Sequence, residues 1–288
     1  MKKPLVSIAC ITYNHEKFIR ETLEGFLMQK TDFPYEILIH DDASTDETAK
    51  IIKKYHRQYP DLIKPVFQTE NQWSKLPVGI NARFNFPRAQ GQYIAMCEGD
   101  DQWIDPYKLQ KQIDFLKNHP EYILCGTDVE RLEVKSGKVV KSLNKKFGEI
   151  SLNDMLYRNP ITTCTTVFKN IDFKSQLLPN YYQFTIGDWP LWCSLMQYGK
   201  AYNLPDVTAR YHIHQGGMVS GRSLSKTLYS KLHDRILLCE NFPDKRNIIK
   251  KHGYKILLHY IKNALKFRIK YVAALWRNKK IIWDFLRK

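Results

Sequence analysis

Apolar residues along the first hundred positions fall into two alternating patterns. Residues 6–11 and 36–40 are short apolar runs typical of buried strands, whereas residues 15–29 carry apolar side chains at helical spacing. A second helical pattern follows residue 44. Strands that alternate with helices predict parallel strands joined by right-handed crossovers. We therefore expect an α/β fold with a mostly parallel central sheet flanked by helices.

The rest of the chain predicts further elements. Strands are expected at residues 64–67, 93–97, 122–125, 165–168 and 202–213, a hairpin turn at residues 135–137, and a helix from about residue 188 to residue 198. Asp188 stands where the N-cap of that helix would be. From residue 224 onward the pattern is helical and basic.

The stretch at residues 93–106 carries the strongest chemical signal. Its apolar run stops at Gly99, Asp100 and Asp101, and a helix start follows, with Asp105 as its expected N-cap. Adjacent residues leaving a strand point to opposite sides, so the two carboxylates can do different work. Their mutual repulsion would be relieved by a divalent cation, and Mg²⁺ suits one or two carboxylates plus substrate phosphates. This stretch predicts a metal–diphosphate site at the carboxyl end of a strand.

Two other polar clusters follow predicted strands, at residues 12–14 and at Asp41 and Asp42. Ligands of such sheets bind beyond the carboxyl ends of the strands. Neither GxGxxG nor GxxxxGK[ST] follows any strand, so dinucleotide-binding and P-loop interpretations lose their usual support. Arg83, in an irregular stretch before the central strand, is a candidate diphosphate contact.

Composition and charge divide the chain in two. Its 288 residues are 43% hydrophobic, and the six cysteines are scattered without a CxxC pair, which favours a reduced, cytoplasmic protein. The net charge of +16 is concentrated in residues 222–288, which hold 18 Lys and Arg against 4 Asp and Glu, whereas residues 1–221 hold 27 and 25. We expect a catalytic unit at 1–221 and a basic helical extension at 222–288.

The extension itself leaves two interpretations open. One helical stripe is apolar (Leu257, Ile261, Leu265, Ile269, Val272, Trp276), and the opposite one is mostly basic (Lys255, His259, Lys262, Lys266, Lys270). The helix could pack on the catalytic unit with a solvated basic face. Alternatively, it could dock on an anionic membrane surface, as a peripheral protein on the inner face of the cell membrane.

The ordered set of motifs resembles the family-2 glycosyltransferases with the GT-A fold. The matching pieces are residues 6–14, residues 41–46 (Asp-Asp-Ala-Ser-Thr-Asp), residues 98–101 (Glu-Gly-Asp-Asp), residues 187–191 (Gly-Asp-Trp-Pro-Leu) and residues 211–217 (Tyr-His-Ile-His-Gln-Gly-Gly). The last piece is similar to the closing loop of a subgroup involved in capsule or lipopolysaccharide synthesis. Any one piece is weak, but the set is specific and covers about residues 4–221.

The resemblance implies a role for each matching residue. Thr12, Tyr13, Asn14 and Asp42 line the base and ribose of a nucleotide-sugar donor, and Asp100 lies near the ribose. Asp101 binds the Mn²⁺ or Mg²⁺ that bridges the diphosphate, and His214 closes over the diphosphate as a candidate for the metal shell. Asp188 is the general base for the acceptor hydroxyl. Two positions depart from the family pattern: Gly187 stands where many relatives have a Glu near the acceptor, and His212 stands where the subgroup usually has an Arg that contacts phosphate.

The activity implied is inverting transfer of a sugar to a saccharide or lipid-linked acceptor in surface polysaccharide synthesis. Such a single displacement needs one base, unlike the paired carboxyls of glycoside hydrolysis. A nucleotidyltransferase is the nearest rival, but it would be expected to carry an N-terminal Gly-rich loop with Arg and Lys. A nucleic-acid-binding protein is suggested by charge alone, without aromatic platforms or groove helices. A catalytically dead sugar-binding relative is disfavoured by the intact Asp101 and Asp188.

Overall fold

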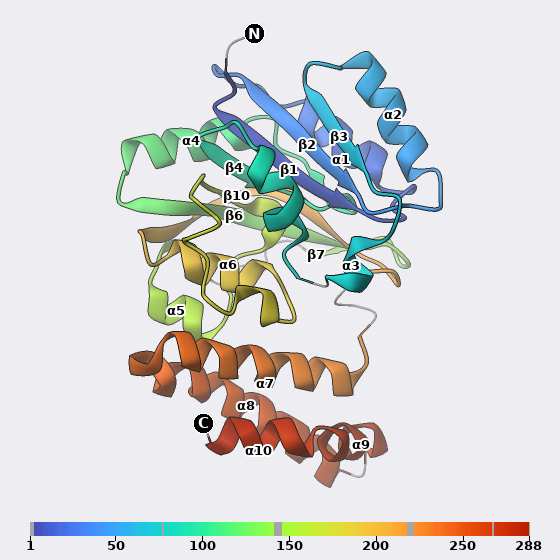
Figure 1. Ribbon diagram of the computed structural model, residues 1–288. Coiled ribbons are helices and arrows are strands. Elements are labelled where there is room, and N and C mark those ends of the chain that lie inside the picture. Colours follow the sequence, from blue (N-terminus) through green and yellow to red (C-terminus); the bar gives the residue numbers. More distant parts are fainter. Residues whose placement is uncertain (1–2, 77, 141–145, 218–221, 267, 288) are drawn as a thin grey trace.

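One large sheet lies at the centre of the α/β part, and helices cover both of its faces (Figure 1). The computed structural model describes residues 3–76, 78–140, 146–217, 222–266 and 268–287. The strands are β1 (Val6–Thr12), β2 (Tyr35–Asp41), β3 (Ile63–Phe67), β4 (Tyr93–Met96), β5 (Gln102–Trp103), β6 (Tyr122–Glu133), β7 (Lys138–Val140), β8 (Gly148–Ile150), β9 (Val167–Lys169) and β10 (Lys200–Ile213). The helices are α1 (Ile19–Leu27), α2 (Thr48–Gln58), α3 (Gln72–Lys75), α4 (Lys108–Asn118), α5 (Leu152–Tyr157), α6 (Asp188–Leu195), α7 (Leu224–Asn241), α8 (Arg246–Leu265), α9 (Ile269–Arg277) and α10 (Lys279–Arg287).

The main strands share one direction. Strands β3, β2, β1 and β4 are neighbours in that order and pair in parallel. Strand β9 then runs antiparallel to both β4 and β6, and β10 pairs in parallel with β6. The predicted α/β architecture with a mostly parallel sheet is confirmed. Its parallel strands end at the same edge, where the polar clusters follow β1, β2 and β4.

Successive side chains along each strand pack alternately into two separate hydrophobic cores, one on each face of the sheet. Val6, Ile8 and Cys10 of β1 pack with the apolar faces of α1, α2 and α4, whereas Ala9 points to the opposite core with α5, α6 and α7. This alternation follows from the two-residue period of a strand. The expected strands are short apolar runs because they are buried on both faces.

Helix α7 belongs to the main core as well as to the C-terminal helices. Leu237, Leu238 and Cys239 lie in the same buried cluster as Trp189 and Trp192 of α6. Earlier positions of α7 share another buried cluster with α8, α9 and α10. In Figure 1 α7 lies between the α/β part and the layer made by these three helices. The expected boundary at residue 221 falls within residues 218–221, outside the described residues.

Two local expectations are wrong. Helix α4 begins at Lys108 and not at Pro106, because the Asp105 Oδ1 atom accepts the N–H of Tyr107 at 2.8 Å in a turn that precedes the helix. Asp188 is the first residue of α6, and Gly187 holds the cap position. Both carboxylates still bond an N–H near the helix start.

The apolar stripe predicted for the extension does not face inward as a whole. Leu257 is buried, but Leu265 is 73% exposed and Ile269 is 82% exposed. Helix α8 ends at Leu265, and helix α9 begins at Ile269. The buried side of α8 is formed by Ile249, Gly253, Ile256, Leu257 and Tyr260. The interpretation of a helix whose apolar stripe packs on the catalytic unit is therefore wrong for most of that stripe. Among the described helices, none is long and apolar enough to cross a bilayer.

Candidate active site

Three loops meet at the carboxyl ends of β1, β2 and β4. Asn14 adopts a positive φ of 55°, and its Oδ1 atom accepts the N–H of Thr45 at 2.8 Å. The N–H of Asn14 donates to Ser44 Oγ at 2.9 Å. Gly99 lies so close to Thr12 that a Cβ atom there would fall 2.6 Å from the Thr12 Cβ. The loop after β1 therefore contacts both the loop after β2, at Ser44 and Thr45, and the loop after β4, at Gly99.

Asp42 is buried and holds the loop that follows β3. Its carboxylate accepts the N–H groups of Gln72 at 2.7 Å and Trp73 at 2.9 Å, and His40 Nε2 lies 3.4 Å away. This arrangement fixes the start of α3 and leaves the Trp73 side chain partly exposed, as is Tyr13. The predicted contact of Asp42 with a nucleotide stays a prediction.

The two adjacent aspartates differ sharply in their surroundings. Asp101 is only 2% exposed, and its Oδ1 atom accepts the N–H of His212 at 3.1 Å. Burial raises the pKa of Asp101 well above its ordinary value, and the negative charges of Asp100 and Glu98 raise it further. Asp101 therefore ties the carboxylate loop (residues 98–101) to β10.

Asp100 faces two histidines instead. Its Oδ2 atom lies 3.0 Å from His214 Nε2 and 3.7 Å from His15 Nε2. Burial opposes ionisation of Asp100, but the hydrogen bond from His214 and the charges of both histidines hold its pKa below the ordinary value. The backbone oxygen of Asp100 is 2.6 Å from His212 Nδ1. The predicted residues Asp100 and His214 are thus brought together across 114 positions, with His15 beside them.

Glu98 was not predicted as a functional residue. Burial raises the pKa of its carboxyl group to about 8, and the charges of Asp100 and Asp188 add to the effect. The charged form of Glu98 is therefore unfavourable beside the other carboxylates of the loop. The available signal in the sequence was a third acidic residue in the run Glu-Gly-Asp-Asp.

These groups fit a divalent cation. Mn²⁺ and Mg²⁺ accept carboxylate oxygen, Mn²⁺ also accepts imidazole, and both leave positions for phosphate oxygens. The Asp100 Oδ2 and His214 Nε2 atoms, a carboxylate oxygen and an imidazole nitrogen, lie 3.0 Å apart. Within the described ranges no group of three or more His, Cys, Asp or Glu side chains forms a protein-only metal cage. A cation that shares its shell with a diphosphate does not need one.

Asp188 is held by three hydrogen bonds. Its Oδ2 atom accepts from Asn159 Nδ2 at 3.2 Å and from Thr163 Oγ1 at 3.1 Å, and its Oδ1 atom accepts the N–H of Trp189 at 2.7 Å. Burial raises its pKa above the ordinary value, although the bonds from Trp189 and Thr163 oppose that shift. A carboxylate has about four acceptor positions, so one remains on Oδ1.

The segment that leads into Asp188 is anchored by α7. The Thr185 N–H and hydroxyl donate to the two carboxylate oxygens of Asp234, each at 2.8 Å. The guanidinium of Arg235 lies over the Trp189 ring, 4.9 Å from its centroid. Both Asp234 and Arg235 are almost fully buried. Sequence reasoning missed both residues, because no motif in α7 indicates that its side chains contact residues about fifty positions earlier in the chain.

Arg83 lies in a single π-helical turn (Asn81–Asn85). Its guanidinium stacks on the Tyr182 ring, 3.8 Å from the centroid. The Nε atom is buried and has no partner among the described residues. Arg88, by contrast, donates to the backbone oxygens of Lys64 and Ile39, which is a structural role. Arg83 therefore keeps donor capacity for a ligand.

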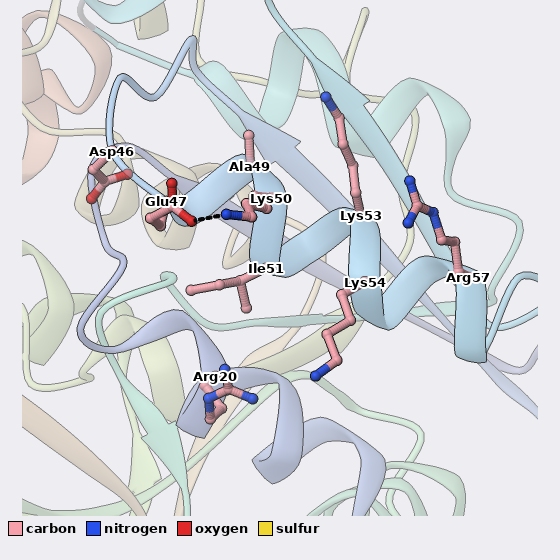
Figure 2. Close-up of a pocket in the computed structure, with 9 residues that line it drawn as sticks. All are labelled: Arg20, Asp46, Glu47, Ala49, Lys50, Ile51, Lys53, Lys54 and Arg57. Atoms are coloured by element: carbon pink, nitrogen blue, oxygen red, sulfur yellow. Dashed lines mark ion pairs between the residues drawn. The ribbon is translucent and has the colours of Figure 1, made fainter.

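A basic recess lies away from these loops, between α1 and α2. It encloses about 600 Å³ and is lined by Arg20, Asp46, Glu47, Ala49, Lys50, Ile51, Lys53, Lys54 and Arg57. Figure 2 shows Arg20 reaching from α1 toward the basic side chains of α2. None of the predicted site residues lines it, and we regard it as a solvated surface, separate from the site.

The fold places the chain in a structural class, the α/β proteins with a GT-A sheet. Solved structures of S. aureus TarS 1-349 match with a TM-score of 0.66 at 18% identity, covering 98% of this chain and 80% of that one. The mannosyltransferase PcManGT from Pyrobaculum calidifontis, solved with GDP-Man and Mn²⁺, matches with a TM-score of 0.60 at 18% identity, covering 97% and 76%. Likeness at this identity shows the fold.

The family follows from the sequence comparison. The model of "Glycosyl transferase family 2" matches residues 7–174, more than half of the chain, so the chain belongs to that family. TuaG of Bacillus subtilis (strain 168), named as a teichuronic acid biosynthesis glycosyltransferase, is 30% identical over 223 residues, covering 76% of this chain and 83% of TuaG. The predicted family resemblance is confirmed.

Two further relatives mark the range of the similarity. WfaP of Escherichia coli, named UDP-Glc:alpha-D-GlcNAc-diphosphoundecaprenol beta-1,3-glucosyltransferase, is 27% identical, covering 84% of this chain and 99% of WfaP. An uncharacterized protein of Mycobacterium tuberculosis (strain ATCC 25618 / H37Rv) is 36% identical over 216 residues, which are 74% of this chain. The match spans only 60% of the length of that mycobacterial protein.

Proposed function

We propose that the protein is an inverting glycosyltransferase of surface polysaccharide synthesis. It would move a sugar from a nucleotide-diphosphate donor to a hydroxyl of a saccharide or lipid-linked acceptor. The observation that carries the proposal is that the carboxylate loop after β4 meets His214, with Asp100 Oδ2 3.0 Å from His214 Nε2. The segment from Thr163 to Thr166 links β4 to Asp188, because Thr163 Oγ1 donates to Asp188 at 3.1 Å and the Met96 N–H donates to the Thr166 oxygen at 3.1 Å. Family membership and the names of TuaG and WfaP support the same activity.

The donor would lie over the ends of β1, β2 and β4. Thr12, Tyr13 and Asn14, with Asp42 behind them, are proposed to line the base and ribose, and Arg83 to contact the diphosphate. Asp100 and His214 are proposed as the protein ligands of Mn²⁺ or Mg²⁺. The sequence prediction gave the metal to Asp101 and the ribose to Asp100. The exchange proposed here rests on geometry: Asp100 Oδ2 lies 3.0 Å from His214 Nε2, whereas Asp101 Oδ1 accepts the N–H of His212. When bound, the cation would neutralise charge on the departing diphosphate.

Asp188 is proposed to take the proton of the acceptor hydroxyl on Oδ1. The hydroxyl oxygen forms a bond to the anomeric carbon while the bond from that carbon to the diphosphate breaks, and the electron pair leaves with the diphosphate. Attack from the face opposite the leaving group inverts the anomeric centre. Asn159 and Thr163 hold the carboxylate in place, and its raised pKa makes it a stronger base.

The acceptor is proposed to reach the site at an anionic membrane surface. The substrate in the name of WfaP is linked to diphosphoundecaprenol, a lipid. A lipid-linked acceptor would favour an enzyme bound peripherally to the membrane on the cytoplasmic side. Nucleic acid is not proposed as a partner.

The test begins with a panel of nucleotide sugars, with and without Mn²⁺ or Mg²⁺. We expect one nucleotide to raise the melting temperature in a metal-dependent way and to support transfer to lipid-linked saccharides. Asp188→Asn should keep donor binding while transfer falls roughly 10²–10⁴-fold, since a positioned base contributes that much.

Asp172→Asn, the same chemical change at an exposed turn, is the matched control and should keep full activity. Transfer at near wild-type rates in Asp188→Asn would show that Asp188 only starts the helix. A lack of response to every nucleotide would overturn the proposed activity altogether.

A further inference from the structure

Helix α9 is apolar on two opposite sides, and only one of them is packed. On its inner side Ala274 is buried, in a cluster with Leu232 and Tyr260, and Tyr271 packs against that cluster. On its outer side Ile269, Val272 and Trp276 follow at positions i, i+3 and i+7, which place them on one face of a helix. These three are 82%, 49% and 70% exposed. The outer face of α9 is thus a row of large apolar side chains in water.

Basic residues flank this outer face. On a helix of about 100° per residue, Arg277 lies a little more than a quarter turn from it and Lys270 about a third of a turn, and Arg268 precedes the helix on the other side. Lys279 lies near the Trp276 ring, 5.6 Å from its centroid. From residue 246 to the end of the sequence Asp284 is the only acidic residue, against 13 Lys and Arg. The apolar face therefore has a strongly positive surround.

We propose that the outer face of α9 is a docking surface for an anionic lipid bilayer. Ile269, Val272 and Trp276 would enter the headgroup region, and Lys270 and Arg277 would contact lipid phosphates. Aromatic residues favour the interface between water and lipid, and each Lys or Arg near an anionic surface adds attraction. The position of α9 supports this, because α8, α9 and α10 form the layer beyond α7, away from the strands (Figure 1).

Two other occupants fit the observations less well. A second copy of the chain, docked through the same face, would bring two sets of flanking cations together and would repel itself. A nucleic acid would satisfy the cations but would leave Ile269 and Val272 in water. A bilayer with anionic headgroups matches both the apolar face and the charge around it.

The experiment measures co-sedimentation of the full chain with phosphatidylcholine vesicles, with and without phosphatidylglycerol. We expect binding only when phosphatidylglycerol is present. Ile269→Ser combined with Trp276→Ser should weaken binding at least about tenfold, because the two side chains lose most of their transfer free energy into lipid. The fold should persist, since both side chains are mostly exposed. Val139→Ser combined with Val140→Ser removes exposed apolar groups from β7 and is the matched control.

A second pair of variants tests the charge. Lys270→Glu combined with Arg277→Glu should weaken binding roughly 30-fold or more, at about 1 kcal/mol for each cation lost. The same change of charge at Lys54 and Arg57, in the recess of Figure 2, should leave binding within about threefold of wild type. Equal loss in both pairs would reveal a non-specific effect of net charge and would overturn the assignment to α9.

Other outcomes also overturn the proposal. These are equal binding to both vesicle types, no binding to either, a dimer in sedimentation that Ile269→Ser dissociates, or tighter binding to single-stranded RNA than to vesicles. The docking proposal rests on the proposed function in one respect: docking would bring the enzyme to a lipid-linked acceptor. Metal-dependent nucleotide binding, measured on the same variants, separates the docking proposal from the proposed function. If the protein binds nucleotide but not vesicles, the docking proposal is wrong and the proposed function stands.

Discussion

The carboxylate loop and helix α9 hold their side chains in opposite ways. Asp100 and Asp101 are each fixed by contacts with β10 and its following loop, and Asp101 is sealed from solvent. In α9, Ile269 and Trp276 extend from the protein surface. A substitution in the loop changes charges that neighbouring groups depend on, whereas one on the outer face of α9 removes contacts that only a partner could supply. The two regions should therefore respond to mutation through different observables.

The largest effect is expected at Asp100. Asp100→Asn removes a charged ligand, so metal-dependent donor binding should weaken by roughly 10–100-fold or more. Calorimetric titration of Mn²⁺ and the preferred nucleotide measures it. Asp101→Asn is the matched comparison: its Oδ1 atom accepts the N–H of His212, which an amide oxygen can also accept, so affinity should stay within a few-fold. If Asp101→Asn loses affinity and Asp100→Asn keeps it, the original assignment of the metal ligand to Asp101 is the right one.

A smaller effect is expected at the contact between α7 and the base. Asp234→Ala removes both acceptors of Thr185, so the segment before Asp188 loses its anchor. We expect kcat to fall about tenfold, with donor affinity unchanged, because only the alignment of the base is disturbed. Asp234→Asn keeps one acceptor and should recover part of the rate. Tyr229→Ser, at an exposed position of the same helix, should behave as wild type, and an equal loss there would assign the effect to the stability of α7.

The smallest effect is a dependence on pH where α7 meets α8. Arg235 Nη2 donates to His252 Nδ1 at 2.5 Å, and burial, followed by the charge of Arg235, lowers the pKa of His252 to about 4. Between about pH 6.5 and pH 4 the unfolded chain therefore binds a proton that the folded protein does not. Stability should fall as pH falls through this window. In His252→Gln the melting temperature should decline by a few degrees less, and an unchanged slope would contradict this account.

Sequence patterns could locate the long buried strands because each is an apolar run followed by polar or turn-forming residues, but they missed the short strands β5 and β8. They could also bring Asp188 and the carboxylate loop into one site, since ordered family motifs imply a shared sheet edge. They could not pair His214 with Asp100 rather than Asp101, because that choice depends on how β10 approaches the loop. Helical periodicity found the stripe through Ile269 and Trp276 but could not say which side was covered, since both sides of α9 are apolar.

The sharing of α7 between two buried clusters has a consequence for how the molecule unfolds. Leu237 and Leu238 pack with Trp189 and Trp192, and Leu228 and Leu232 of the same helix pack with Tyr260 and Phe285. Melting the outer helices exposes one side of α7, and melting the sheet exposes the other. We therefore expect the α/β part and the C-terminal helices to unfold together, because each covers one side of α7. Calorimetry should record a single transition, and truncation before α8 should lower its temperature and not merely remove an appendage.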